Sequence, residues 1–195
     1  MFLKACLAVL VLFVSASLAL GQTVTLPVWV ADTDWRGSED RSGYAALRFA
    51  FSASSVTMTD RNGPTVGTWN QTGDPITMTF HEGKVVYTGT IQGQVCNYTW
   101  SCRKNADDFY VFHVSVNCRG AVMSGTAQNG DSYPWNWNAT MAPLPLEVVG
   151  VCDRVPFDFP IYFDSSGSGS GEAIMGREMP SPAELGTWRI RLMQR

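Results

Sequence analysis

Tryptophan is the side chain with the clearest capacity for ligand contact in this sequence, and the chain has seven of them. Aromatic side chains inside a β-barrel can line a pocket for a small apolar molecule or stack on the rings of a glycan. They can equally fill an eight-stranded barrel, whose interior is only just wide enough for side chains. The sequence favours the filling role and keeps the ligand-binding role open for Trp35, Trp69, Trp135 and Trp137.

Groups for acid–base or nucleophilic catalysis are sparse. His81 and His113 are the two histidines, and no Gly-x-Ser-x-Gly motif exposes a nucleophilic serine. A glycosidase needs two carboxyl groups that flank the scissile bond, and the sequence does not select a pair from its candidates, Glu39, Asp40, Glu82, Asp107 and Asp108. We expect a binding protein without catalysis, and the alternative is a carbohydrate-active hydrolase that uses paired carboxylates.

Metal, cofactor and nucleic-acid partners are not indicated. The cysteines lack the paired C-x-x-C spacing of a zinc site, and the two histidines do not complete one. The formal net charge is −3, whereas nucleic-acid partners usually show a basic patch or stripe. We therefore expect no metal and no cofactor, and the predicted partner is a small apolar molecule or a glycan.

The N-terminus has the pattern of a secretory signal peptide. A basic start at Lys4 precedes an apolar stretch from Ala5 to Leu20, which is short for a membrane-spanning helix. We predict a signal peptide over residues 1–21 and a secreted chain over residues 22–195. No later segment is apolar enough to span a bilayer.

Four cysteines remain after the signal, and export makes disulfides the expected state. On one extended strand, Cys96 and Cys102 would lie about 20 Å apart, whereas a disulfide needs α-carbons within about 7 Å. A returning strand would bring Cys118 to Cys96. We therefore favour Cys96–Cys118 and, by elimination, Cys102–Cys152, although a bend at Asn97–Thr99 would permit Cys96–Cys102 instead.

Three N-x-T sequons occur, at Asn70, Asn97 and Asn138. Asn97 and Asn138 fall on the strand faces opposite their aromatic neighbours, where a glycan could project into solvent. This placement predicts N-glycosylation at the three asparagines in a host that modifies such sites.

Short strands separated by turns fill the chain from residue 33 to residue 141. Ile76, Met78 and Phe80 alternate with threonines, which is the period of a half-buried strand. Asn-Gly pairs favoured in hairpins end two of the strands. The pattern predicts an all-β fold, an antiparallel up-and-down barrel with a β-sandwich as the alternative. Its strands are Ala46–Phe51, Val56–Asp60, Val66–Asn70, Ile76–Phe80, Val85–Ile91, Val95–Cys102, Phe109–Cys118, Val122–Ala127 and Trp135–Met141.

The composition changes at residue 142. A proline-rich and glycine-rich extension follows over residues 142–185, and it contains the low-complexity Ser165–Gly171, which predicts a flexible loop. Residues 186–195 hold a terminal strand in which Trp188, Ile190 and Leu192 share a face. We expect one domain, with the extension lying over the barrel and the last strand closing or edging it. An exposed tail that docks to a partner is the alternative.

Several motifs together resemble the hairpin series of secreted lipocalin-like and avidin-like barrels. They are Asp34-Trp35-Arg36-Gly37, Gly67-Thr68-Trp69, Tyr87-Thr88-Gly89-Thr90-Ile91-Gln92-Gly93 and Met123-Ser124-Gly125. The resemblance covers residues 34–141, and it implies an up-and-down barrel that binds a ligand. No ligand-contacting residue of those families can be matched to a position here. The expected function is therefore binding of a small molecule or glycan outside the cell, with an extracellular structural or protein-interaction module as the alternative.

Overall fold

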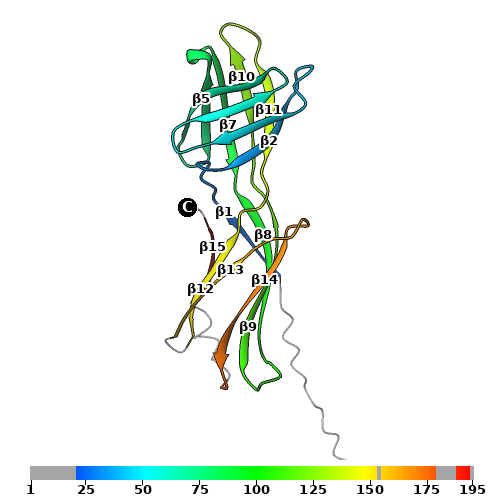
Figure 1. The fold of residues 1–195 in the computed structure, drawn as a ribbon, viewed down its shortest axis with the longest axis vertical. Helices are drawn as coiled ribbons and strands as arrows, with labels where there is room; N and C mark the ends of the chain where they lie inside the picture. The colour runs from blue at the N-terminus through cyan, green and yellow to red at the C-terminus, as the bar shows by residue number, and fades with distance from the viewer. Residues whose placement is uncertain (1–20, 153–154, 179–187, 194–195) are drawn as a thin grey trace, which may run out of the picture.

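The chain folds into two β-structured parts that lie end to end along the long axis of the molecule (Figure 1). The computed structural model describes residues 21–152, 155–178 and 188–193. Apart from Gly21, the predicted signal peptide lies outside the described residues. One part is a closed barrel, and the other consists of two facing sheets, which we call the sandwich.

Eight antiparallel strands close the barrel in the order β10-β11-β2-β3-β4-β5-β6-β7. This confirms the predicted all-β, antiparallel up-and-down barrel and agrees with the lipocalin-like resemblance at the level of coarse architecture. The strands are β2 (Asp34–Glu39), β3 (Leu47–Phe51), β4 (Val56–Asp60), β5 (Gly63–Gln71), β6 (Pro75–Phe80), β7 (Val85–Gln92), β10 (Val122–Asn129) and β11 (Trp135–Thr140). A single 3-10 turn, η1 (His81–Gly83), joins β6 to β7.

Alternating side chains determine which face of each strand turns inward. Trp135, Trp137 and Ala139 are buried on β11, while the residues between them are exposed. The buried side chains form one cluster in which Tyr87 contacts the rings of four neighbours, with centroid separations of 5.6 to 6.1 Å. Aromatic and methionine side chains therefore fill the centre of the barrel.

Two glycines make room for the largest of these rings. Gly89 on β7 lies opposite Gly125 on β10. A Cβ at Gly89 would lie 2.8 Å from the ring of Trp137, and one at Gly125 would lie 1.9 Å from the carbonyl oxygen of Thr88. The glycines of two motifs noted in the sequence thus permit close strand pairing around Trp137.

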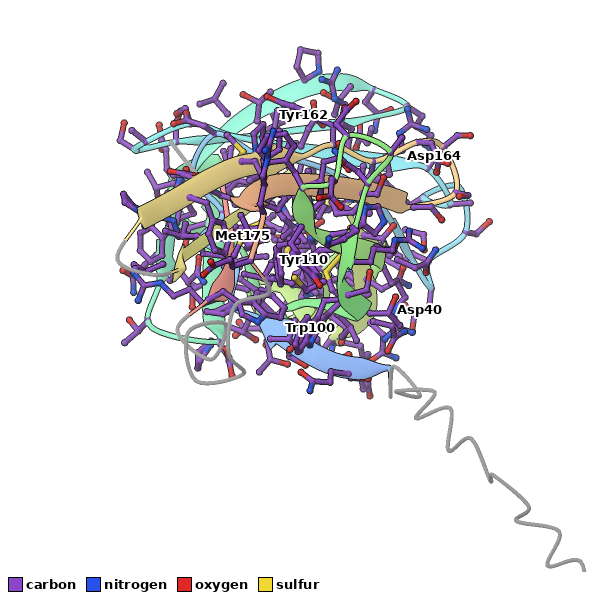
Figure 2. All side chains as sticks on the ribbon, turned by 90° about the horizontal axis from the view of Figure 1, so that it is seen from below. Asp40, Trp100, Tyr110, Tyr162, Asp164 and Met175 are labelled. Atoms are coloured by element: carbon purple, nitrogen blue, oxygen red, sulfur yellow. A yellow bond between two sulfur atoms is a disulfide. The ribbon has the colours of Figure 1, made fainter. Side chains whose placement is uncertain are left out.

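The sandwich contains the strands that do not belong to the barrel. One sheet has the order β1-β8-β9-β14 and the other has the order β13-β12-β15. Their bounds are β1 (Gln22–Leu26), β8 (Gln94–Lys104), β9 (Tyr110–Arg119), β12 (Leu146–Cys152), β13 (Val155–Ile161), β14 (Ser168–Gly176) and β15 (Arg189–Leu192). Seen from the sandwich end in Figure 2, side chains crowd the space between the sheets.

This arrangement corrects two predictions. The strands Val95–Cys102 and Phe109–Cys118 fell within the predicted core, residues 33–141, although their cysteine-bearing hairpin departs from the lipocalin-like pattern. In the structure β7 pairs directly with β10, so these strands lie outside the barrel. The extension 142–185 was expected over the barrel, but its strands β12 and β13 cover the inner face of β8 and β9, and its strand β14 pairs with β9. The physical reason is that this inner face is apolar, through residues such as Phe112 and Val114, and it must be buried against another element. The prediction that residues 22–195 form one domain stays a prediction.

The prediction of a flexible loop over Ser165–Gly171 is also wrong, because the second half of this segment begins β14, which pairs with β9. Its glycines allow β14 to approach β13. A Cβ at Gly169 would lie 2.5 Å from the carbonyl oxygen of Tyr162, and one at Gly171 would lie 2.5 Å from the Phe159 ring. Small residues here serve close packing and not flexibility.

The terminal strand also differs from its prediction. Its described residues are Arg189–Leu192, and they pair with β12 of the sandwich, so they neither close nor edge the barrel. The proline-bearing β13 lies at the edge of the three-stranded sheet, where a missing N–H is tolerated.

The segment between β1 and β2 closes the barrel end that faces the sandwich. Val28 and Val30 are buried in the barrel cluster. The Gln71 amide donates to the Val28 carbonyl at 2.8 Å, and its oxygen accepts from the Val30 N–H at 3.0 Å. The opposite end, which carries the β2–β3 and β4–β5 turns, is the free end of the molecule (Figure 1).

Candidate functional site

A buried carboxylate lies at the free end of the barrel. The side chain of Glu39, the last residue of β2, has no exposed surface. Tyr87 donates its hydroxyl to one oxygen of Glu39, and Arg41 donates Nε to the other oxygen at 2.7 Å. A buried charge is tolerated in a protein when it is paired and hydrogen-bonded, and Glu39 satisfies both conditions.

Arg41 covers this carboxylate from the solvent side. Its guanidinium carbon lies 3.7 Å from the centroid of the Trp135 ring and 4.4 Å from that of Tyr44. The Arg41 side chain is 38% exposed, so the cluster can be reached from solvent. The guanidinium carbon of Arg61, in the turn after β4, lies 5.1 Å from the centroid of the Tyr44 ring. We call Glu39, Arg41, Tyr44, Tyr87 and Trp135 the rim cluster.

One donor of the rim cluster is unused. The Nε1 atom of Trp135 is buried, and no described group accepts a hydrogen bond from it. Leaving a buried donor unpaired costs free energy, and most such groups in proteins have a partner. Trp135 therefore offers a hydrogen-bond donor beside the cation and the carboxylate.

The pKa of the Tyr87 hydroxyl is raised above its ordinary value. Burial is the main cause, and the hydrogen bond to the Glu39 carboxylate adds to it. An anionic tyrosine beside an anionic glutamate would be doubly unfavourable, so Tyr87 stays a donor. This fixes Glu39 as the acceptor at the centre of the cluster.

The hairpin between β2 and β3 holds Arg41 in place through its backbone. Asp40 accepts hydrogen bonds from the backbone N–H of Asn136 at 3.1 Å and from its side chain at 2.8 Å. The backbone N–H of Glu39 donates to the carbonyl of Tyr44 at 2.9 Å. The loop is thus anchored on both sides of Arg41, and only the arginine side chain must move to open the cluster.

The four predicted ligand-binding tryptophans do not meet in one place. Trp135 belongs to the rim cluster, and Trp137 lies deeper in the barrel, where its Nε1 donates to the carbonyls of Thr88 and Thr126. Trp35 is fully buried. Trp69 is half-buried at the end that faces the sandwich, with its ring 5.4 Å from that of Trp29. Their role in ligand binding stays a prediction.

The acidic candidates are also separated. Glu39 and Asp40 lie at the free end of the barrel, and Glu82 is exposed in η1. Asp107 and Asp108 lie in the turn between β8 and β9, at the far end of the sandwich, where Asp108 pairs with Lys104 at 2.7 Å. Asp107 and Asp108 are therefore at the opposite end of the molecule from Glu39 and Asp40, and a catalytic carboxylate pair stays a prediction.

The histidines are apart from the rim cluster. His81 is exposed in η1, and His113 on β9 shares a hydrogen bond with Ser115 at 3.0 Å. Neither has a carboxylate partner among its described hydrogen bonds and ion pairs, as a catalytic triad would require.

The sandwich contains a carboxyl pair that sequence reasoning missed. Glu147 on β12 and Asp158 on β13 interact, and Arg191 donates to Glu147 at 2.5 Å. The arginine lowers the pKa of Glu147, while burial and the Glu147 carboxylate raise the pKa of Asp158. Only the pairing of β12 with β13 and β15 brings these residues together, and no sequence spacing signals it.

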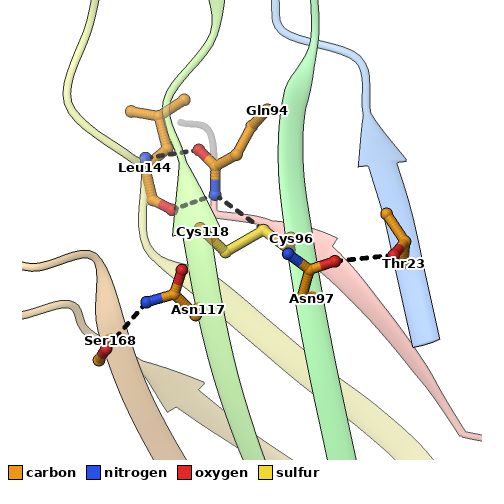
Figure 3. Close-up of a disulfide and its surroundings, with 8 residues drawn as sticks. All are labelled: Thr23, Gln94, Cys96, Asn97, Asn117, Cys118, Leu144 and Ser168. Carbon is orange, nitrogen blue, oxygen red and sulfur yellow. Dashed lines mark hydrogen bonds between the residues drawn. A yellow bond between two sulfur atoms is a disulfide. The ribbon is translucent and has the colours of Figure 1, made fainter. Parts of the chain in front are cut away.

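The predicted Cys96–Cys118 disulfide is confirmed, with an S–S distance of 2.02 Å between directly paired residues of β8 and β9 (Figure 3). The thiol of Cys102 is free in the described structure, and burial raises its pKa. The side chain of Cys152 lies outside the described residues, so the Cys102–Cys152 bond stays a prediction.

All three sequon asparagines are exposed on strands, Asn70 on β5, Asn97 on β8 and Asn138 on β11. Asn97 accepts a hydrogen bond from Thr23 at 2.7 Å (Figure 3), and Asn138 donates to Ser38 at 3.2 Å. Their accessibility fits glycosylation, which stays a prediction.

No family model, curated protein or solved structure matches the chain. Among the described residues, no helix is long and apolar enough to cross a membrane, and no cluster of three metal-ligating side chains occurs.

Proposed function

We propose that this protein is a secreted binding protein that holds a small polar molecule or a sugar at the free end of its barrel. The observation that carries the proposal is the rim cluster, a fully buried carboxylate beside a buried indole N–H that has no described acceptor, in a barrel filled mainly by apolar side chains. A carboxylate acceptor, an indole donor and two aromatic rings are the groups that fix the hydroxyls and faces of such a ligand.

The filled interior favours the rim over a central cavity. Trp35, Phe49 and Met78 are fully buried in the barrel cluster, and the linker before β2 closes the other end. A ligand large enough to need a lipocalin-like cavity would have to displace these side chains. A ligand at the rim needs only Arg41 to move.

Secretion belongs to the same proposal. The Cys96–Cys118 disulfide is compatible with an oxidising compartment, where such bonds persist. The pattern of residues 1–21 supports export independently of the disulfide.

Titration calorimetry on the mature chain tests the proposal. The probes are glucose, galactose, N-acetylglucosamine and the dye 1-anilinonaphthalene-8-sulfonate. Glu39→Gln and Trp135→Phe should each weaken binding of the active probe about tenfold, because each loses one hydrogen-bonding group to the ligand.

The matched control is Trp69→Phe, which alters a tryptophan at the opposite end of the barrel and should bind as the unmodified chain does. If all three variants bind the probe with equal affinity, the ligand site is not at the rim. The absence of heat with every probe would count against the function itself.

A further inference from the structure

Two arginines face each other on the outer wall of the barrel. The register of β2 and β3 places Arg36 directly opposite Arg48, and both side chains are exposed. Like charges at directly opposed positions destabilise a sheet. The chain has 14 basic residues and a net charge of −3, and two of these basic residues form an unfavourable pair.

The nearby acid compensates only one of the two. Asp34 accepts a hydrogen bond from Nε of Arg48 at 2.7 Å and a second from its terminal nitrogen, in the two-point geometry that suits an arginine and a carboxylate. The charge of Arg36 lowers the pKa of Asp34 without a hydrogen bond between them. Arg36 forms no hydrogen bond or ion pair with another described side chain. Its five donors remain available to a ligand.

A third arginine extends the row toward the free end. Thr59 on β4 is the cross-strand neighbour of Arg48, and Arg61 follows two residues later in the turn. Exposed positions of β2 and β3 and the turn after β4 thus carry the three arginines on one side of the barrel.

The wall is hollowed where these arginines lie. A groove of about 870 Å³ has all three arginines in its lining, together with Asp60 and uncharged polar side chains. A second groove of about 720 Å³ shares two of the arginines, includes Asp34 and continues the first groove toward Ala142. We call the lining side chains Arg36, Ser38, Arg48, Thr59, Arg61 and Asn138 the arginine groove. From Asp34 to Ser38 the wall runs about 13 Å along β2, which is longer than a single small anion requires.

We infer that the arginine groove binds an acidic polysaccharide, with Arg36 and Arg48 each holding a carboxylate or sulfate group. The hydroxyl and amide groups of Ser38, Thr59 and Asn138 suit the sugar hydroxyls between the acidic groups. Arg61 connects this groove to Tyr44 of the rim cluster, whereas Arg36 and Arg48 lie outside that cluster.

The side chains that line the grooves favour a polysaccharide over a nucleic acid. Neither groove has an aromatic residue in its lining, whereas single-stranded nucleic acids are held by stacking on such residues. The hydroxyl and amide groups beside the arginines suit a ligand that carries hydroxyls between its acidic groups.

Binding of polygalacturonate and dextran sulfate fragments to the full mature chain tests this inference, with uncharged dextran and polyuridylate as comparisons. The protein is made without N-glycans, because Asn138 lies in the groove. At least one acidic polysaccharide should bind, more weakly as NaCl rises, and uncharged dextran should not bind. Binding of polygalacturonate identifies the recognised group as a carboxylate, and binding of dextran sulfate identifies it as a sulfate.

Arg36→Ala should weaken this binding about tenfold, the loss expected for a charge-assisted hydrogen bond. Its melting temperature should be equal to or above that of the unmodified chain, because the like-charge pair is gone. Arg103→Ala removes an exposed strand arginine of the sandwich and should bind normally. Equal affinity of Arg36→Ala and the unmodified chain, or binding of polyuridylate as tight as that of the polysaccharides, would overturn the inference.

Discussion

Replacing Tyr87 with phenylalanine removes one oxygen atom from the centre of the rim cluster. The ring keeps its edge-on contacts with Phe49, Phe80 and the two tryptophans of β11, because these involve only carbon atoms. The lost group is the donor to Glu39, whose side chain is fully buried. The variant therefore isolates a hydrogen bond to a buried charge.

A hydrogen bond to a charged group contributes about 1.5 to 3 kcal/mol to stability. The contact of the Tyr87 hydroxyl with the sulfur of Met58, at 3.4 Å, adds little because a thioether is a weak acceptor. We expect Tyr87→Phe to lose about 2 kcal/mol near neutral pH. For a chain of this size, that corresponds to a fall in melting temperature of about 4 to 8 °C.

The pH dependence has a definite sign. The raised pKa of Tyr87 means that the folded state keeps its proton where a tyrosine of the unfolded chain loses it. The contribution of Tyr87 is therefore complete below about pH 10 and is lost as the pH rises further. The stability difference between the unmodified chain and Tyr87→Phe should shrink over that alkaline range.

Urea unfolding at several pH values measures both effects. Tyr133→Phe is the matched control, because Tyr133 is 95% exposed and its hydroxyl can bond to water in either state. The control should unfold as the unmodified chain does. A loss below about 0.5 kcal/mol in Tyr87→Phe would refute the reasoning, because it would mean that solvent already satisfies the Glu39 carboxylate.

Three further outcomes are expected. Replacing Cys96 and Cys118 with alanine should lower stability in urea by about 3 kcal/mol, because the bond joins residues 22 apart in the chain. Gly125→Ala should cost about 3 kcal/mol or more, because its Cβ would overlap the Thr88 carbonyl, and circular dichroism should show a lower melting temperature. N-glycosylation at Asn138 should block acidic polysaccharide from the arginine groove, and Asn138→Gln, which removes the sequon, should bind when made in the same glycosylating host.

The barrel strands could be predicted because each carries its information locally. Strand β4 has the predicted bounds, Val56–Asp60, because alternation defines its faces and an Asn-Gly turn ends it. Asp60 accepts the backbone N–H of Asn62 at 2.7 Å, and Gly63 adopts a φ of 109° that other residues rarely adopt. The turn residues and the alternation of buried and exposed side chains along the strand can both be read from about ten consecutive residues.

The partition between barrel and sandwich could not be predicted in this way. Strands β8 and β9 alternate as regularly as the barrel strands, and nothing in their pattern shows that β7 pairs past them with β10. The pairing depends on residues more than 30 positions apart, such as Gly89 and Gly125. The local disulfide between β8 and β9 was predictable because it required only one hairpin.

The rim cluster was only partly visible in the sequence. Trp135 and Glu39 were both candidates, one for ligand contact and one for acid chemistry. Tyr87 was noted only as part of a motif, and Arg41 gave no signal. The pairing of β11 with β2 brings Trp137 opposite Glu39 and so sets Trp135 near the same loop, which no spacing along the chain reveals.

The two ends of the barrel differ in a way that bears on function. At the sandwich end, the amide of Gln71 makes three hydrogen bonds to backbone groups and satisfies the polar atoms that it buries. At the free end, Glu39 is satisfied only by a buried hydroxyl and by a half-exposed arginine, and Trp135 keeps an unpaired donor. A barrel closed for stability alone would favour the neutral, fully bonded solution at both ends, because buried charges bring a desolvation cost that an apolar or amide residue avoids. The charge at the accessible end therefore supports the proposed ligand site at the rim.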